Sequence, residues 1–375
     1  MKVIKYILCG LFVTTLFTAC HHKEKKSYDS IGKSGLTTRT EFLNKNLRTF
    51  RDKGVLFGQE YGTIEGVGWK NNIQGSDFKS ICDDLPSCTG FELAGVEKGM
   101  PMNIDSISFN LMRGDILDYI RHGGLITMSW TAPNPFGNKS KVTDNDMAQL
   151  LQDGTPPNKV IKEWTKKIAL YLGSLQDGYG IKVPVVLSLY PETGKSWWSN
   201  ISAGNYKELY QQTIGWLKHD GVDNVLFAYT QTKVGDEAAF MSCFPGEGVD
   251  VINFRYIQPN KEKSVAKYKD VMSKMLPMLV NYGEAQNKII GITTGMEGVP
   301  DKHFWTETLL PLIKANKISY LMLGRNYGDA RQLHFCAPYP GDKSVPDFVK
   351  MYNDNCTLFM SDVNGLYLDH PKHIS

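Results

Sequence analysis

Short apolar runs alternate with longer amphipathic segments along most of the 375-residue chain. Apolar runs rich in β-branched residues and bounded by turn signals predict buried strands. The eight predicted strands span residues 55–58, 88–93, 125–130, 183–189, 225–229, 249–256, 288–294 and 318–323. Segments with apolar residues three or four positions apart predict helices. These span residues 37–52, 76–82, 105–121, 161–175, 205–218, 265–282, 304–314 and 345–352.

This alternation predicts an α/β fold, a (β/α)8 TIM barrel that forms a single domain from residue 37 to residue 375. The rival architecture is a doubly wound open sheet. It is disfavoured because no glycine-rich phosphate-binding loop follows the first predicted strand. In a barrel, residues at the carboxyl ends of the strands form the active face. Here these residues are Glu60, Glu92, Trp130, Glu192, Tyr229, Arg255, Thr294 and Arg325.

The chemistry of these strand ends suits a neutral polysaccharide. The fourth predicted strand ends at Glu192, and Trp197 and Trp198 follow it closely. A carboxylic acid in this place can protonate a glycosidic oxygen, and the rings can stack on the apolar faces of sugars. The alternative is an ordinary polar turn with both tryptophans in a satellite core. No pair of histidines or cysteines stands at the strand ends, so we expect no metal site and no cofactor.

The first residues read as a targeting segment. Lys2 and Lys5 precede an apolar run over residues 6–18 that is short for a bilayer span. The run ends Thr18-Ala19-Cys20, which resembles a bacterial lipobox. We therefore expect a signal peptide at 1–19, a lipid on Cys20 and a polar tether at 20–36, which together describe an exported bacterial lipoprotein anchored in a membrane, periplasmic or at the cell surface. The alternative is a plain secretory signal.

Net charge bears on the expected partners, and the cysteine content bears on the expected disulfides. The formal net charge is only +3, so no nucleic-acid partner is expected, and a monomer is the default state. Beyond the signal segment and the lipid-bearing Cys20, five cysteines remain, an odd number that allows at most two disulfides. The closest pair in sequence, Cys82 and Cys88, is the candidate for a bridge. The full set is Cys82, Cys88, Cys243, Cys336 and Cys356.

Several motifs stand at or near the predicted strands. They are Leu56-Phe57-Gly58-Gln59-Glu60, Phe91-Glu92, Thr127-Met128-Ser129-Trp130-Thr131-Ala132-Pro133-Asn134-Pro135, Ile318-Ser319-Tyr320, Gly324-Arg325-Asn326 and Ala337-Pro338-Tyr339-Pro340-Gly341. Together they resemble glycoside hydrolase family 26, whose typical members are endo-β-1,4-mannanases and whose corresponding motifs read LFGHQ, Trp-Asp, TxSWHxxNP, ISY, WRN and APYPG. The likeness covers nearly the whole chain beyond the tether.

The resemblance implies a β-mannan or manno-oligosaccharide ligand and a retaining mechanism with two carboxylates about 5 Å apart. Counting along the fourth strand from Pro184-Val185 places the family's acid/base on Glu192, whereas anchoring on the following Thr-Gly places it on Pro191. We favour Glu192, because a deletion fits more easily in a loop than in a strand. The resemblance also implies these substrate-binding residues: Trp130, Trp197, Trp198, Asn134, Arg325, Asn326, Arg255 and Glu92.

The family's nucleophile is missing. Its seventh strand reads ALTETG, but this chain reads Gly291-Ile292-Thr293-Thr294-Gly295, with Thr294 or Thr293 in place of the glutamate. Arg255 stands where the family has an aspartate, and Gly324 where it has a tryptophan. A threonine hydroxyl without a base is a poor nucleophile.

Three hypotheses follow. The first is a weakly active or non-catalytic β-mannan-binding lipoprotein. The second is an active hydrolase in which Glu192 is the acid and Glu60, Glu92 or Glu297 is a relocated partner; a more distant base would correspond to an inverting reaction. The third is a barrel reused for another ligand or a protein partner.

Overall fold

The computed structural model describes residues 31–32, 34–72, 75–139, 141–191, 194–329 and 331–369. Eight parallel strands follow one another in chain order around a ring, which the pairing of β10 with β1 closes. The barrel strands are β1 (Val55–Glu60), β4 (Cys88–Glu92), β5 (Leu125–Trp130), β6 (Val185–Leu189), β7 (Val225–Gln231), β8 (Val251–Gln258), β9 (Ile289–Met296) and β10 (Tyr320–Leu323). The predicted (β/α)8 barrel is therefore confirmed.

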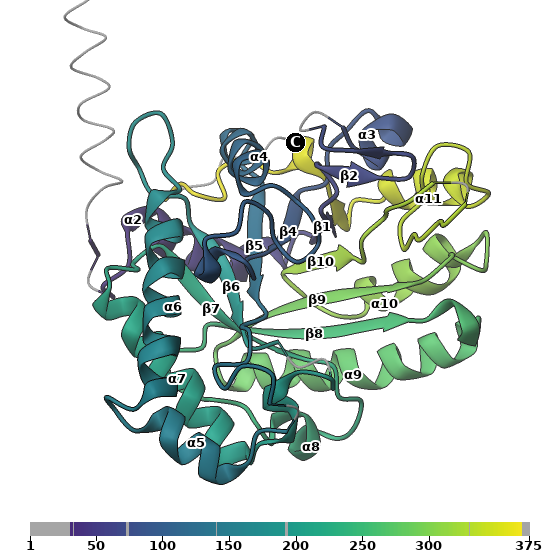
Figure 1. Cartoon of the computed structure of the whole chain (residues 1–375). Coiled ribbons are helices and arrows are strands. Elements are labelled where there is room, and N and C mark those ends of the chain that lie inside the picture. The colour runs from purple at the N-terminus through teal and green to yellow at the C-terminus, as the bar shows by residue number, and fades with distance from the viewer. Residues whose placement is uncertain are drawn as a thin grey trace, which may run out of the picture.

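Helices surround the strands, as Figure 1 shows. The longer ones are α2 (Thr38–Phe50), α4 (Phe109–Arg121), α6 (Pro156–Ser174), α7 (Ala203–His219), α9 (Val265–Ala285) and α11 (Val345–Tyr352). A π-helical turn, η4 (Trp305–Leu309), leads into α10 (Leu310–Lys314). Each buries its apolar stripe against the barrel, which explains why helical spacing located them.

Several short elements were not predicted. They include the hairpin strands β2 (Glu65–Gly66) and β3 (Trp69–Lys70), the strand β11 (Thr357–Leu358) beside β1, and the helices α5 (Asp144–Leu151) and α8 (Glu237–Met241). The predicted helix near residue 76 is α3 (Asp77–Cys82), and four 3₁₀ turns are η1 (Val96–Lys98), η2 (Trp197–Asn200), η3 (Asn260–Glu262) and η5 (Met360–Asp362). A capping box begins α5, since Thr143 and Asp146 exchange side-chain and backbone hydrogen bonds.

A large side chain occupies the barrel interior beside Gly291, below the carboxyl ends of the strands. Tyr320 on β10 lies across Gly291 on β9, where a Cβ atom would overlap the tyrosine ring. Glycine is therefore required at position 291 to let this ring fill the interior. The Tyr320 side chain is almost fully buried, and Cys88 on β4 lies beside it at the same level.

The suggested disulfide can be compared with the structure. The five cysteines in the described residues are free thiols, so Cys82 and Cys88 do not form the suggested bridge; Cys88 lies inside the barrel wall on β4, fully buried. Among the helices of the described residues, none is long and apolar enough to cross a membrane. Cys20 and the signal segment lie outside the described residues.

Candidate active site

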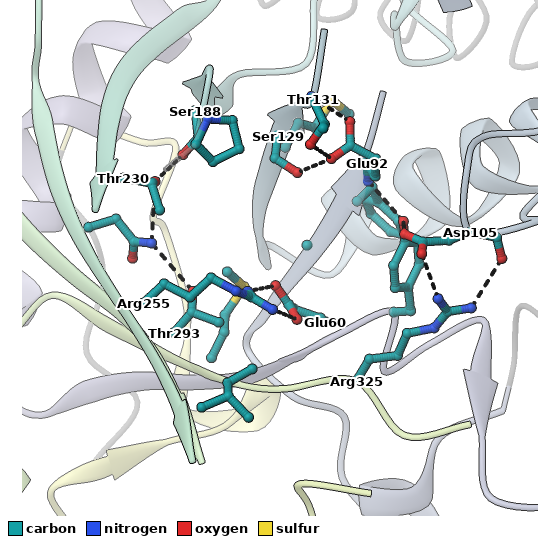
Figure 2. A pocket seen from close by; sticks show the side chains of 18 of the residues that line it. Glu60, Glu92, Asp105, Ser129, Thr131, Ser188, Thr230, Arg255, Thr293 and Arg325 are labelled. Atoms are coloured by element: carbon teal, nitrogen blue, oxygen red, sulfur yellow. Dashed lines mark hydrogen bonds and ion pairs between the residues drawn. The ribbon is translucent and has the colours of Figure 1, made fainter. Parts of the chain in front are cut away.

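A cavity of about 620 Å³ opens among the carboxyl ends of the barrel strands. Its charged lining residues come from several strands and from the loops that follow them (Figure 2). They are Glu60, Glu92, Asp105, Arg255, Glu297 and Arg325, and the imidazole of His334 lies among them. Three of the predicted ligand-binding residues, Glu92, Arg255 and Arg325, therefore lie in one cavity. The three carboxylates considered as relocated partners, Glu60, Glu92 and Glu297, lie there too.

The predicted acid/base, Glu192, lies outside the described residues. Pro191, directly before it, lines the cavity at the end of β6. The residue between β6 and Pro191 is Tyr190, whose backbone has a positive φ of 47° although it is not a glycine. The Tyr190 side chain is fully buried and bonded to Thr213, at 2.8 Å, which shows that packing holds this strained backbone in place.

The two threonines of β9 point to opposite sides of the barrel wall. Thr293 lines the cavity, and its hydroxyl lies 3.4 Å from the amide nitrogen of Asn253. The Thr294 hydroxyl points outward, 2.8 Å from the hydroxyl of Tyr268 on α9. Alternation along the strand therefore presents Thr293, and not the predicted Thr294, to the cavity, which favours Thr293 for the position of the missing nucleophile.

An ion pair crosses the cavity floor. The Arg255 guanidinium on β8 binds both carboxylate oxygens of Glu60 at the end of β1, with Nη2 3.1 Å from Oε2 (Figure 2). Burial alone would lower the pKa of Arg255, but the charge of Glu60 and its hydrogen bonds outweigh this and raise the pKa. In strand register, Arg255 is the neighbour of Thr293. The floor beside this threonine is thus occupied by a bidentate salt bridge.

Glu92 is buried at the end of β4, and four protein groups donate to its carboxylate. The donors are the backbone N–H groups of Ala94 and Thr131, at 2.8 and 2.9 Å, and the hydroxyls of Ser129 and Thr131, both at 2.8 Å. Burial raises the pKa of Glu92, and these hydrogen bonds oppose the rise. With its acceptor capacity taken, Glu92 is better suited to holding the loop after β5 than to chemistry.

Four planar groups are stacked along one wall of the cavity, and we call them the wall stack: Tyr61, Arg325, Tyr327 and His334. The Arg325 guanidinium lies 4.8 Å from the ring centre of Tyr61 and 5.0 Å from that of Tyr327. The Tyr327 and His334 rings are 4.5 Å apart and nearly parallel, at 19°. Cation–π and ring stacking thus join the ends of β1 and β10 to the loop that contains His334.

Carboxylates fix the arginine of the wall stack. Arg325 Nε donates to Glu65 Oε2 at 2.6 Å, and Nη1 lies 2.9 Å from Asp105 Oδ1. Burial lowers the pKa of Arg325, whereas Asp105 and Glu65 raise it and prevail. Both arginines that line the cavity are therefore paired with protein carboxylates. Neither guanidinium is free to bind the carboxylate of an acidic sugar through two hydrogen bonds.

Five predicted binding residues lie outside the cavity lining and support its walls instead. Trp130 and Trp198 are almost fully buried, and Trp197 donates to the Ala132 carbonyl at 3.0 Å. Asn134 organises its own loop, accepting from Phe136 N–H at 3.0 Å. The fifth, Asn326, is fully buried and bridges separate parts of the backbone. Their side chains therefore do not line this cavity, and their contact with a ligand stays a prediction.

Sequence reasoning missed the small polar residues of the floor. Ser188 and Thr230 share a hydrogen bond of 2.6 Å, and Asn253 lies 3.4 Å from the Thr230 hydroxyl. The alternation of side chains along a strand could have identified them. An isolated polar residue in an otherwise apolar strand indicates the face that points into the barrel. At the end of β7 this signal selects Thr230, whereas the predicted Tyr229 points outward and is fully buried. No group of three metal-ligating side chains converges within the described residues.

Comparison with known proteins agrees with the fold and the motifs. A sequence model of glycosyl hydrolase family 26 matches residues 33–307. A β-mannanase of this family from Bacteroides ovatus is 33% identical and superimposes with a TM-score of 0.83, over 90% of this chain and 100% of the other. The catalytic domain of an endo-β-1,4-mannanase from a Bacillus species is 22% identical, with a TM-score of 0.78 over 92% and 98% of the chains. The chain therefore belongs to glycosyl hydrolase family 26.

Proposed function

We propose that the protein binds β-mannan or manno-oligosaccharides in the barrel cavity and hydrolyses them weakly or not at all. One observation carries this proposal: β9 presents the Thr293 hydroxyl to the cavity, and the strand contains no carboxylate. A threonine hydroxyl has a pKa far above neutrality and needs a base to become a nucleophile. The Thr293 hydroxyl lies 3.4 Å from the amide nitrogen of Asn253, which is not a base.

The surroundings of Thr293 support the same conclusion. Arg255 lies beside it in register and is held by Glu60. The positive charge of Arg255 is therefore already paired with Glu60. No second carboxylate in this pair is left to act on the substrate. The polar floor and the wall stack nevertheless leave a cavity of about 620 Å³, room for a short run of sugar units. The mannan preference comes from the family and from the Bacteroides ovatus β-mannanase.

Binding and turnover should be measured on the same preparation. Titration calorimetry with mannohexaose is expected to show saturable binding, and chromatography of the mixture after long incubation should recover the hexaose almost intact. The Glu192→Gln variant should hydrolyse mannohexaose no faster than the unaltered protein does, because Glu192 is the assigned acid. Rapid formation of shorter oligosaccharides by the unaltered protein would contradict the proposal.

A second candidate function is an active hydrolase with Glu192 as acid and Glu60 as its partner. The observation in its favour is the Arg255 salt bridge, which holds the Glu60 carboxylate in the cavity, where a nucleophile or base has to lie. If the unaltered protein degrades mannohexaose, Glu60→Gln and Glu192→Gln should each abolish that activity. Retained activity in Glu60→Gln would exclude this partner.

We also propose that the chain is an exported lipoprotein in which Cys20 carries the lipid and residues 20–36 form the tether. Support comes from the lipobox-like sequence that ends the apolar run. In a bacterial host, metabolic labelling with a palmitate analogue should mark the unaltered protein, and Cys20→Ala should lose the label and leave the membrane fraction. Equal labelling of both proteins would contradict the assignment. The barrel begins only at α2, so the substitution should leave its folding unchanged.

A further inference from the structure

Two polar side chains face each other across a narrow gap at the cavity rim, after β9 and after β10. Glu297 Oε1 and His334 Nδ1 are 3.9 Å apart. Both side chains line the cavity, and they are 31% and 26% exposed. The separation is too long for a hydrogen bond, so the two groups lie close together without satisfying one another.

Other contacts hold both sides of the gap. Glu297 Oε2 accepts from the Asn260 N–H at 3.0 Å, which fixes the carboxylate. His334 is the outer member of the wall stack, packed on Tyr327, and the backbones of these two residues exchange hydrogen bonds of 2.9 and 3.1 Å. The positions of Glu297 and His334 are therefore fixed by contacts of the loops that contain them, and the gap between them does not depend on freely rotating side chains.

The groups around His334 together lower its pKa. Burial lowers the pKa of His334; Glu297 and Glu60 oppose this, Arg325 adds to it, and the net shift is downward. Cys336 Sγ, 4.0 Å from Nε2, is the other titratable neighbour, and burial raises its thiol pKa, so it stays neutral. A neutral imidazole facing a carboxylate gives a potential N–H donor beside a charged acceptor.

We propose that Glu297 and His334 form a clamp for one sugar hydroxyl, which accepts from the imidazole and donates to the carboxylate. An oxygen about 2.8 Å from both atoms fits between groups 3.9 Å apart, with an angle near a right angle at that oxygen. The sugar ring that carries this hydroxyl would lie against the exposed edge of the Tyr327–His334 stack. The clamp rests on the proposed function, and it adds the residues that bind the glycan on this side.

A double-mutant cycle on mannohexaose affinity tests the clamp. His334→Phe keeps the stacked ring but removes both nitrogens, and Glu297→Gln keeps an acceptor for Asn260 but removes the charge. Each variant should bind about tenfold more weakly, because each loses one hydrogen bond to the sugar hydroxyl. The double variant should bind hardly more weakly than either single one, because one hydroxyl bridges both groups. Glu262→Gln, a charge removal outside the cavity lining, should bind as the unaltered protein does.

The outcomes separate two kinds of failure. If the unaltered protein shows no calorimetric binding, the proposed function fails and the clamp fails with it. If it binds and the single variants bind equally well, or if the double variant shows the product of two independent losses, the clamp alone is overturned. Thermal unfolding of each variant checks that the fold is kept, since both side chains are partly exposed.

Discussion

Replacing Thr293 with glutamate is expected to create hydrolysis of manno-oligosaccharides. The side chain at position 293 already faces the cavity, so glutamate would bring a carboxylate to the floor, where Arg255 lies beside it in register. Removing one member of a catalytic unit typically costs up to about a millionfold in rate, so restoring it should raise turnover on the order of a hundredfold or more. Reducing-end assays on mannohexaose, with a β-mannoside that carries a good leaving group as second substrate, would measure the gain.

Two matched variants show whether the gain is chemical. Thr293→Gln has nearly the same shape as the glutamate but no charge, and it should remain inactive. Combining Thr293→Glu with Glu192→Gln should lose most of the gain on mannohexaose, whose leaving group needs an acid. Equal rates for Thr293→Glu and Thr293→Gln would show that a carboxylate on β9 is not what the site lacks. The neighbouring change, Thr294→Glu, should only destabilise, since Thr294 is fully buried against Tyr268.

Replacing Asn326 with alanine should cost about 3–4 kcal/mol of the free energy of unfolding. The Asn326 amide donates to Asp77 Oδ2 at 2.8 Å and to the Ala337 carbonyl at 3.1 Å. Its oxygen accepts from the N–H groups of Cys336 and Ala337, at 3.0 and 3.1 Å. Truncation would leave all four groups buried without this partner. Urea unfolding followed by tryptophan fluorescence would measure the loss.

An exposed asparagine provides the control for this change. Asn353 bonds only to a carbonyl of its own helix, at 2.7 Å, and Asn353→Ala should change stability by less than about 0.5 kcal/mol. The sequence motif suggested that Asn326 binds the ligand. If Asn326→Ala kept full stability and lost only glycan affinity, that role would be restored, and the supporting role described above would be wrong.

The barrel could be predicted because its physical cause is periodic. Buried parallel strands are apolar on both faces, and the covering helices carry one apolar stripe, so both leave a regular pattern in the sequence. The helix α5 was missed although Thr143 and Asp146 stand at capping-box spacing, because a short helix in a long loop adds little periodicity.

The side chains of the site were harder to predict, because a shift of one residue reverses the direction in which a side chain points. Thr294 and Tyr229 were chosen where Thr293 and Thr230 face the cavity. Residue size and motif position favour Thr294 and Tyr229. Small polar residues that interrupt an apolar strand are the better indication of which side chains face the cavity. The Glu60–Arg255 salt bridge joins residues 195 positions apart. Two charges at predicted strand ends do not reveal which cation binds which anion, since this depends on where the strands lie around the ring.

The seam between β1 and β10 links the formation of the cavity to the final stage of folding. Leu56 pairs with Tyr320 across this seam, and Tyr61 and Arg325 of the wall stack lie at its end. Contacts between such distant parts of a chain carry a large loop-closure entropy and tend to form late. A ring open at the seam would thus have most of its helices but only part of the cavity wall. An oligosaccharide that needs this wall would bind only the closed ring and would shift the folding equilibrium toward it by mass action.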